Sequence, residues 1–195
     1  MKYKRKEKRI MLSYKMNIAG LDRDLTLCPV NENLYIGAFI MFGDTELTTA
    51  CADALLSRVP EHDYIITAEA KGIPLAHEMS RLNGDAKYFV ARKKPKLYMS
   101  GVFEVTVKSI TTEGEQKLYL DRADADLMRG KRILIVDDVI STGESLRAIE
   151  ELVAAAGGIT VGKATVLAEG DAQDRADIIY LEKLPLFNPD GPAIG

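Results

Sequence analysis

Short apolar runs alternate with segments of helical spacing along most of the chain. The clearest run, residues 133–136, has four apolar residues without alternation, which is typical of a strand covered on both faces in a parallel sheet. Further strands are predicted at residues 63–67, 86–92, 160–168 and 177–181, and helices at about residues 46–59, 74–82 and 145–156. Strands that alternate with helices predict an α/β fold, with a mostly parallel open sheet and helices on both faces.

Two segments depart from this alternation. Residues 17–43 contain apolar side chains without a clear period, and we expect them to form a small hood over a ligand, or else a loop-rich edge of the core. Residues 101–110 alternate strictly and precede a second short run around Tyr119, which predicts a β-hairpin with a flexible tip of Ser, Thr, Glu and Gly. We therefore expect one domain, with an N-terminal segment and hood at residues 1–45, a core at residues 46–187 and a loose tail at residues 188–195.

The composition is that of an ordinary globular protein. Of 195 residues, 47% are hydrophobic and 28% charged, and the net charge of -3 gives no reason to expect nucleic acid as the main partner. No apolar run is long enough for a bilayer or placed as a secretory signal, so we expect a cytoplasmic protein without a membrane partner. The basic stretch of residues 1–9 could touch RNA or anionic lipid, but a solvated, frayed or antiparallel edge segment explains it better, and we assign it no function.

Candidate chemistry follows the run at residues 133–136. Asp137 and Asp138 come directly after it, at the carboxyl end of a predicted central strand, where open α/β sheets bind ligands. A loop of small and hydroxylic residues then leads into a helix: Ser141, Thr142, Gly143, Glu144 and Ser145. Because a helix start exposes unpaired N–H groups and partial positive charge, this loop can bind a phosphate. Carboxylates beside it can accept hydrogen bonds from sugar hydroxyls or hold a hydrated cation, so the pattern predicts a sugar phosphate as ligand.

Residues 133–145 resemble the phosphoribosyl pyrophosphate binding motif of the type I phosphoribosyltransferases: a hydrophobic strand, two acids, then Thr-Gly-x-Ser/Thr. A receiver-like domain, or a capped helix after a buried strand, would share part of this pattern. The resemblance implies that residues 141–145 bind the 5-phosphate and that Asp137 and Asp138 act in catalysis by holding the ribose hydroxyls. It also implies Mg²⁺ as cofactor, held by these two acids through water. Val139 and Ile140 would pack on the base.

Two further segments resemble the adenine-type members of this family. Glu69, Ala70, Lys71 and Gly72 resemble their Glu-Ala-Arg-Gly pyrophosphate loop, with Lys71 in place of the usual Arg. Residues 92–97 resemble their Arg-Lys-x-x-Lys-Leu-Pro segment, which implies that Arg92, Lys93 and Lys96 neutralise the pyrophosphate. In the family this segment reaches a neighbouring active site, so the resemblance implies a homodimer. Taken alone, such a charge run is usually a solvated surface.

The predicted hairpin lies where the family carries its flexible catalytic loop. Adenine-type enzymes have Glu-Tyr-Gly there, whereas this chain has Glu113 followed directly by Gly114. The resemblance therefore implies a catalytic contribution from Glu113. An ordinary β-hairpin is the alternative.

The implied function is that of a glycosyltransferase in purine salvage: transfer of ribose 5-phosphate from phosphoribosyl pyrophosphate to a purine base, with release of pyrophosphate. We favour adenine, since no Lys or Arg lies within four residues after Asp138 to bind the O6 atom of a 6-oxopurine. A xanthine/guanine-type enzyme remains an alternative, as does a regulator that binds the donor without transfer. A phosphoribosyl pyrophosphate synthetase shares the motif but has tandem domains, for which this chain is short.

Overall fold

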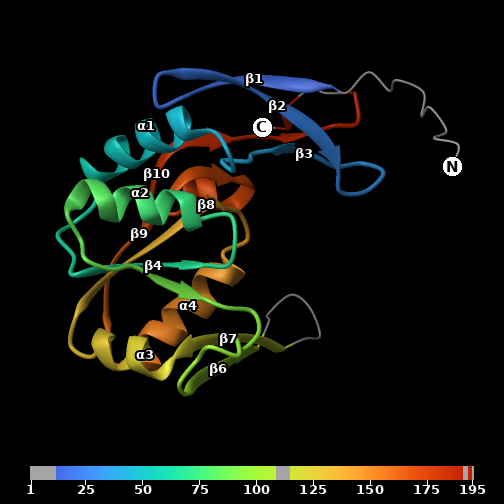
Figure 1. The fold of residues 1–195 in the computed structure, drawn as a ribbon. Helices are drawn as coiled ribbons and strands as arrows, with labels where there is room; N and C mark the ends of the chain where they lie inside the picture. Colours follow the sequence, from blue (N-terminus) through green and yellow to red (C-terminus); the bar gives the residue numbers. More distant parts are fainter. Residues whose placement is uncertain (1–11, 109–114, 191–192, 195) are drawn as a thin grey trace, which may run out of the picture.

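The computed structural model describes residues 12–108, 115–190 and 193–194, and its centre is a five-stranded parallel sheet with the order β10-β9-β8-β4-β5. Figure 1 shows this sheet across the middle of the molecule. Its strands are β4 (Tyr64–Ala68), β5 (Phe89–Ala91), β8 (Arg132–Ile140), β9 (Ile159–Glu169) and β10 (Ile179–Leu184). The predicted α/β class, the parallel sheet and the central position of residues 133–136 are confirmed.

Helices cover both faces of this sheet (Figure 1). On one face lie α1 (Thr45–Leu56) and α2 (Ile73–Asn83), and on the other lie α3 (Arg122–Met128) and α4 (Glu144–Ala155). Side chains of β8 alternate between the two cores: Leu134 and Val136 pack with the first helix pair, and Ile133 and Ile135 with the second. Because both faces are covered, the strand is apolar without alternation.

A β-hairpin packs on α4, on the side of the molecule opposite the N-terminal strands (Figure 1). It consists of β6 (Val102–Lys108) and β7 (Glu115–Asp121), paired antiparallel, with Leu118 and Leu120 buried against the core around α4. The predicted hairpin is therefore present. Its tip, with Glu113, lies outside the described residues, so its flexibility stays a prediction. The short helix α3, capped by the Asp121 side chain, was not predicted.

The hood is a second sheet rather than a set of loops. It joins β1 (Ser13–Ile18), β2 (Leu21–Pro29) and β3 (Tyr35–Ala38) to two C-terminal strands, β11 (Leu186–Phe187) and β12 (Ala193–Ile194). The hood therefore draws on both ends of the chain. The expectation of a loose tail at residues 188–195 needs correction, because Ala193 and Ile194 pair with β11.

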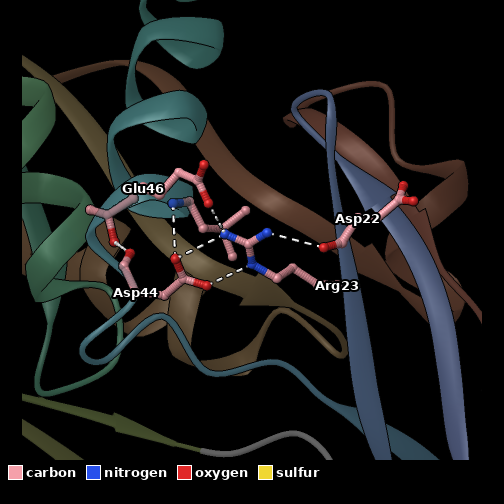
Figure 2. A network of polar contacts seen from close by, with 6 residues as sticks. Asp22, Arg23, Asp44 and Glu46 are labelled. Carbon is pink, nitrogen blue, oxygen red and sulfur yellow. Dashed lines mark hydrogen bonds and ion pairs between the residues drawn. The ribbon is translucent and has the colours of Figure 1, made fainter.

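One cluster of charged side chains ties the hood to the core. Arg23 of β2 donates from Nε to Asp44 Oδ2 at 2.7 Å and from Nη2 to Glu46 Oε2 at 2.8 Å. Asp44 also caps α1, because its Oδ1 accepts a hydrogen bond from the Leu47 amide. Figure 2 shows the Arg23 guanidinium enclosed between these two carboxylates. The cluster fixes the hood against the start of the first core helix.

Candidate functional site

Two carboxylates stand side by side near the carboxyl end of β8. Asp137 and Asp138 lie within the strand, which continues to Ile140 because β9 stays paired with it through Ala168. Asp138 is only 3% exposed, and its amide donates to Asp137 Oδ1 at 2.9 Å. Burial, and then the neighbouring charge of Asp138, raise the pKa of Asp137 to about 7. We call these residues the acidic pair.

Residues 69–72, the first glycine loop, connect β4 to α2 beside the acidic pair. The Glu69–Ala70 peptide bond in this loop is cis. A side chain at Gly72 would place its Cβ 2.3 Å from Thr67 Oγ1 and 3.0 Å from Asp137 Oδ1. Only glycine fits so close to the neighbouring strand. Lys71, in the same loop, lies with its Nζ 3.2 Å from Asp138 Oδ2. This oxygen is buried and accepts no hydrogen bond within the described chain.

Glu69 contacts three residues of the basic segment, residues 92–97, at the rim of the same site. Its Oε1 lies 3.3 Å from both Arg92 Nη1 and Lys96 Nζ, and its Oε2 accepts from the Lys93 amide at 3.3 Å. Burial acts to raise the pKa of Glu69, but the hydrogen bonds from Lys93 and Lys96 and the nearby charges hold it below its usual value. The cationic side chains of residues 92–97 therefore lie beside the first glycine loop, although the two segments are separated in sequence by α2 and β5.

A cavity of about 260 Å³ opens between these groups. It is lined by Ala68, Glu69, Ala70, Lys71, Lys93, Leu118, Asp137, Asp138, Val139 and Ser145. The structure thus brings the first glycine loop, the acidic pair and Ser145 into one place. Ile140 is instead buried in the core around α4, and Glu113 lies outside the described residues.

Residues 141–145, the second glycine loop, connect β8 to α4. Gly143 is the N-cap of α4, with φ of +78°, and no side chain caps the helix there. The amide groups of the first helical turn are therefore left for a ligand. Ser141, Thr142 and Ser145 are exposed and add hydroxyl groups to this end of the site.

Three residues at or near the site were not identified from the sequence. Leu118 of the hairpin lines the cavity, and only the alternation of its strand could have indicated an inward side chain. Glu169, half-buried at the end of β9, has a pKa raised by burial, an effect that the charge of Lys71 opposes. Arg175 lies against Gly143, where a Cβ would come 2.3 Å from its Nη1. No local motif marks either of the last two residues.

A comparison with family models identifies the class of protein. Residues 45–184 match the model of the phosphoribosyl transferase domain, which is most of the chain, so the chain belongs to this family. A hypoxanthine/guanine phosphoribosyltransferase from Methanococcus voltae is 37% identical over 113 residues, 58% of this chain and 56% of that protein. An HGPRTase-like protein 3 from Haloterrigena turkmenica is 34% identical over 137 residues, 69% of each chain. The alignment with the first of these relatives thus spans little more than half of that protein's length.

Solved structures share the fold. An adenine phosphoribosyltransferase from Saccharomyces cerevisiae, complexed with adenine and an imino-altritol bisphosphate, aligns with a TM-score of 0.63 at 22% identity, covering 81% of this chain and 92% of that one. One from Thermoanaerobacter pseudethanolicus aligns with a TM-score of 0.60 at 24% identity, covering 73% and 84%. At these identities the likeness establishes the fold of the type I phosphoribosyltransferases. Among the described residues no helix is long and apolar enough to cross a membrane.

Proposed function

We propose that this protein transfers ribose 5-phosphate from phosphoribosyl pyrophosphate to a purine base and releases pyrophosphate. The observation that carries the proposal is the placement of two glycine loops on either side of the acidic pair, around one cavity. The second glycine loop offers helix amides and hydroxyls to the 5-phosphate. The first glycine loop and the basic segment offer cations to the pyrophosphate at the other end of the donor.

The chemistry asks for positioning and charge stabilisation. The bond from the ribose C1 atom to pyrophosphate breaks, and its electron pair leaves with the pyrophosphate. A nitrogen of the base bonds to C1 and gives up its proton to the pyrophosphate or to water. Lys71, Arg92, Lys93 and Lys96 would neutralise the leaving group, while the acidic pair holds the ribose hydroxyls beside the cationic sugar. In the structure Glu69 and Asp138 hold three of these cations in ion pairs, ready to exchange a carboxylate for a phosphate.

The acidic pair also fits a hydrated Mg²⁺. Asp138 Oδ2 is buried and accepts no hydrogen bond from any described residue, although Lys71 Nζ lies 3.2 Å away, so it can accept one from a water ligand of the ion. Within the described ranges no group of three or more His, Cys, Asp or Glu residues could hold a metal by itself. Mg²⁺ bound here would take its other ligands from water and from the donor, and it would neutralise part of the pyrophosphate charge.

We propose adenine as the base. Glu169 ends β9 next to the strand that carries Val139 and Ile140, and a carboxylate there accepts a hydrogen bond from an amino group but repels a carbonyl oxygen. The named relatives favour the second candidate, hypoxanthine or guanine, because curated proteins of the family at 37% identity carry that name.

The test is to incubate the protein with phosphoribosyl pyrophosphate, Mg²⁺ and each of adenine, hypoxanthine, guanine and xanthine, and to measure pyrophosphate release. We expect the highest kcat/KM with adenine, and a shift toward the 6-oxopurines in Glu169→Lys but not in the control Glu182→Lys, whose side chain is exposed on β10. Turnover with 6-oxopurines alone would reverse the choice of base. Donor binding without turnover on any base would make the protein a regulator.

We also propose a homodimer. Leu97 at the end of the basic segment is fully exposed and Tyr98 after it mostly so, next to cations that the family shares across a dimer interface. Sedimentation at micromolar concentration should give a dimer, which Leu97→Asp weakens and Leu127→Asp, at an exposed position on α3, leaves intact. An active wild-type monomer would show that the cations serve their own chain.

A further inference from the structure

The second glycine loop brings no cation of its own to the phosphate it would bind. Its five residues, Ser-Thr-Gly-Glu-Ser, carry a formal charge of one acid, Glu144. A phosphate ester near neutral pH carries between one and two negative charges. The helix amides supply only about half a positive charge, so a charged donor beside the loop would add much to binding.

Arg175 lies against this loop in the structure. It follows the short 3-10 helix η1 (Gly170–Asp174) that leads from β9 toward β10. A Cβ built at Gly143 would lie 2.3 Å from Arg175 Nη1 and 3.6 Å from its Cζ, so the guanidinium approaches the loop with Nη1 foremost. The side chain is 30% exposed, which leaves room for a ligand to reach it.

The other edge of the Arg175 guanidinium is fixed. Its Nε donates to Asp177 Oδ1 at 2.9 Å and its Nη2 to Asp177 Oδ2 at 2.7 Å. Lys163 of β9 holds Asp177 in turn, because its Nζ lies 2.6 Å from Asp177 Oδ2 and 2.8 Å from Glu150 Oε1 on α4. A planar guanidinium held along one edge keeps its remaining nitrogen in a defined place. Within the described chain Nη1 makes no recorded hydrogen bond.

We propose that Arg175 is a binding residue for the 5-phosphate, and that Asp177 and Lys163 are the positioning residues that aim it. This inference rests on the proposed function, since it assigns a further contact to the same donor. Gly143 is required on this view for two reasons: its φ of +78° forms the loop, and its missing side chain lets Nη1 reach the ligand. The sequence separates Arg175 from the loop by all of α4 and β9, and only the fold joins them.

The two ends of the donor provide the test. Ribose 5-phosphate and inorganic pyrophosphate are titrated separately by calorimetry into the wild type, Arg175→Met, Arg175→Lys and Asp177→Asn. We expect Arg175→Met to lose at least about tenfold in affinity for ribose 5-phosphate, the effect of one lost charged hydrogen bond, while pyrophosphate affinity stays the same. Arg175→Lys should retain part of the affinity, and Asp177→Asn should lose less than Arg175→Met. In turnover the loss should appear in the KM for the donor before kcat.

Arg147→Met is the matched control. Arg147 lies in the first turn of α4 and pairs with Glu151. The substitution Arg147→Met therefore removes the same charge, close to the loop but away from the Arg175 position. Equal affinity for ribose 5-phosphate in the wild type and Arg175→Met would overturn the inference, as would equal losses in Arg147→Met and Arg175→Met or a matching loss for pyrophosphate. If the wild type binds neither ribose 5-phosphate nor pyrophosphate, the proposed function itself fails, an outcome that the wild-type titrations alone reveal.

Discussion

The two glycine loops of the site each contain one glycine, but they need it for different reasons. Gly72 of the first loop has an ordinary φ of −73°, and its side chain is excluded by Thr67 and Asp137 on the neighbouring strands. Gly143 of the second loop has a φ of +78°, a conformation that L-residues avoid, and what lies beside it is the guanidinium of Arg175, which Asp177 holds along one edge. A clash at Gly72 is therefore with the adjacent strands of the sheet, and a clash at Gly143 is with one side chain from a distant segment.

The loops also differ in how they obtain charge. At the first loop, the acids that hold the cations, Glu69 and Asp138, lie inside the site and compete with a phosphate for Lys71, Arg92 and Lys96. At the second loop, the acid Asp177 holds Arg175 from behind and leaves one nitrogen free. The first arrangement suits a group that must bind and leave, as pyrophosphate does. The second suits a phosphate that stays attached to the ribose through the reaction.

The largest effect is expected at Gly72. Gly72→Ala should reduce kcat/KM by about a hundredfold, because the loop must shift by about an ångström away from Thr67 and Asp137. Thr67→Ala removes the closer of the two obstacles, so the double variant should regain part of the activity. Steady-state kinetics with thermal melts separates a displaced loop from an unfolded protein. Full activity in Gly72→Ala would show that the loop is not held against β8.

At Gly143 a graded series should replace the single large loss. Gly143→Asn should lose only a few-fold in affinity for ribose 5-phosphate, since Asn tolerates positive φ but its Cβ still meets Arg175 Nη1, whereas Gly143→Ala should lose about tenfold. Gly143→Val should lose most, about thirtyfold or more, because its branched side chain also displaces Arg175 and blocks the phosphate. Calorimetric titration measures all three. Undiminished affinity in Gly143→Val would remove the loop from the phosphate site.

The acidic pair lies between the loops and should affect the chemistry more than binding at either end. Asp137→Asn and Asp138→Asn should each lower kcat by at least about tenfold, or about 1.4 kcal/mol of transition-state stabilisation, with little change in ribose 5-phosphate affinity. Asp53→Asn, which neutralises an exposed carboxylate on α1, is the control. The acids would be excluded from the mechanism if both variants kept full activity.

Stability should depend on pH through Asp137. Burial beside Asp138 raises the pKa of this carboxyl from an ordinary 3.8 to about 7, so the folded state disfavours its ionised form. The stability that this group contributes is present below pH about 4 and is lost as the pH rises through 7, with a slope of at most about 1.4 kcal/mol per pH unit. Melting without Mg²⁺ at pH 5 and pH 8 should therefore show a steeper fall for the wild type than for Asp137→Asn. Parallel curves would contradict the assignment.

The core and the elements around the acidic pair could be predicted because their signals are local. The apolar run of β8, its two acids and the loop that follows are continuous in the sequence, and the exposed N-terminus of α4 follows from helix geometry. The alternation along residues 101–110 of the sequence likewise predicted β6, since a hairpin pairs neighbouring segments.

What the sequence did not reveal depends on contacts between distant segments. Met16, Ile18 and Leu25 are buried in the hood, but whether their strands form a sheet depends on β11 and β12 at the other end of the chain. Arg175 is one arginine among many until the fold places it at Gly143. Local periodicity predicts elements, whereas such juxtapositions need the tertiary structure.

The smallest effect is expected from the hood, at a distance from both loops. Arg23→Met removes the ion pairs to Asp44 and Glu46, which are partly exposed and screened by solvent, so Tm should fall only slightly. Affinities for ribose 5-phosphate and pyrophosphate should not change, because neither loop contacts Arg23. The matched control is Lys15→Met, whose partner Asp22 lies within the hood and joins nothing to the core. A loss of donor affinity in Arg23→Met, but not in Lys15→Met, would mean that the hood helps to hold both glycine loops in place. The two loops would then depend on one shared contact in addition to their different local ones.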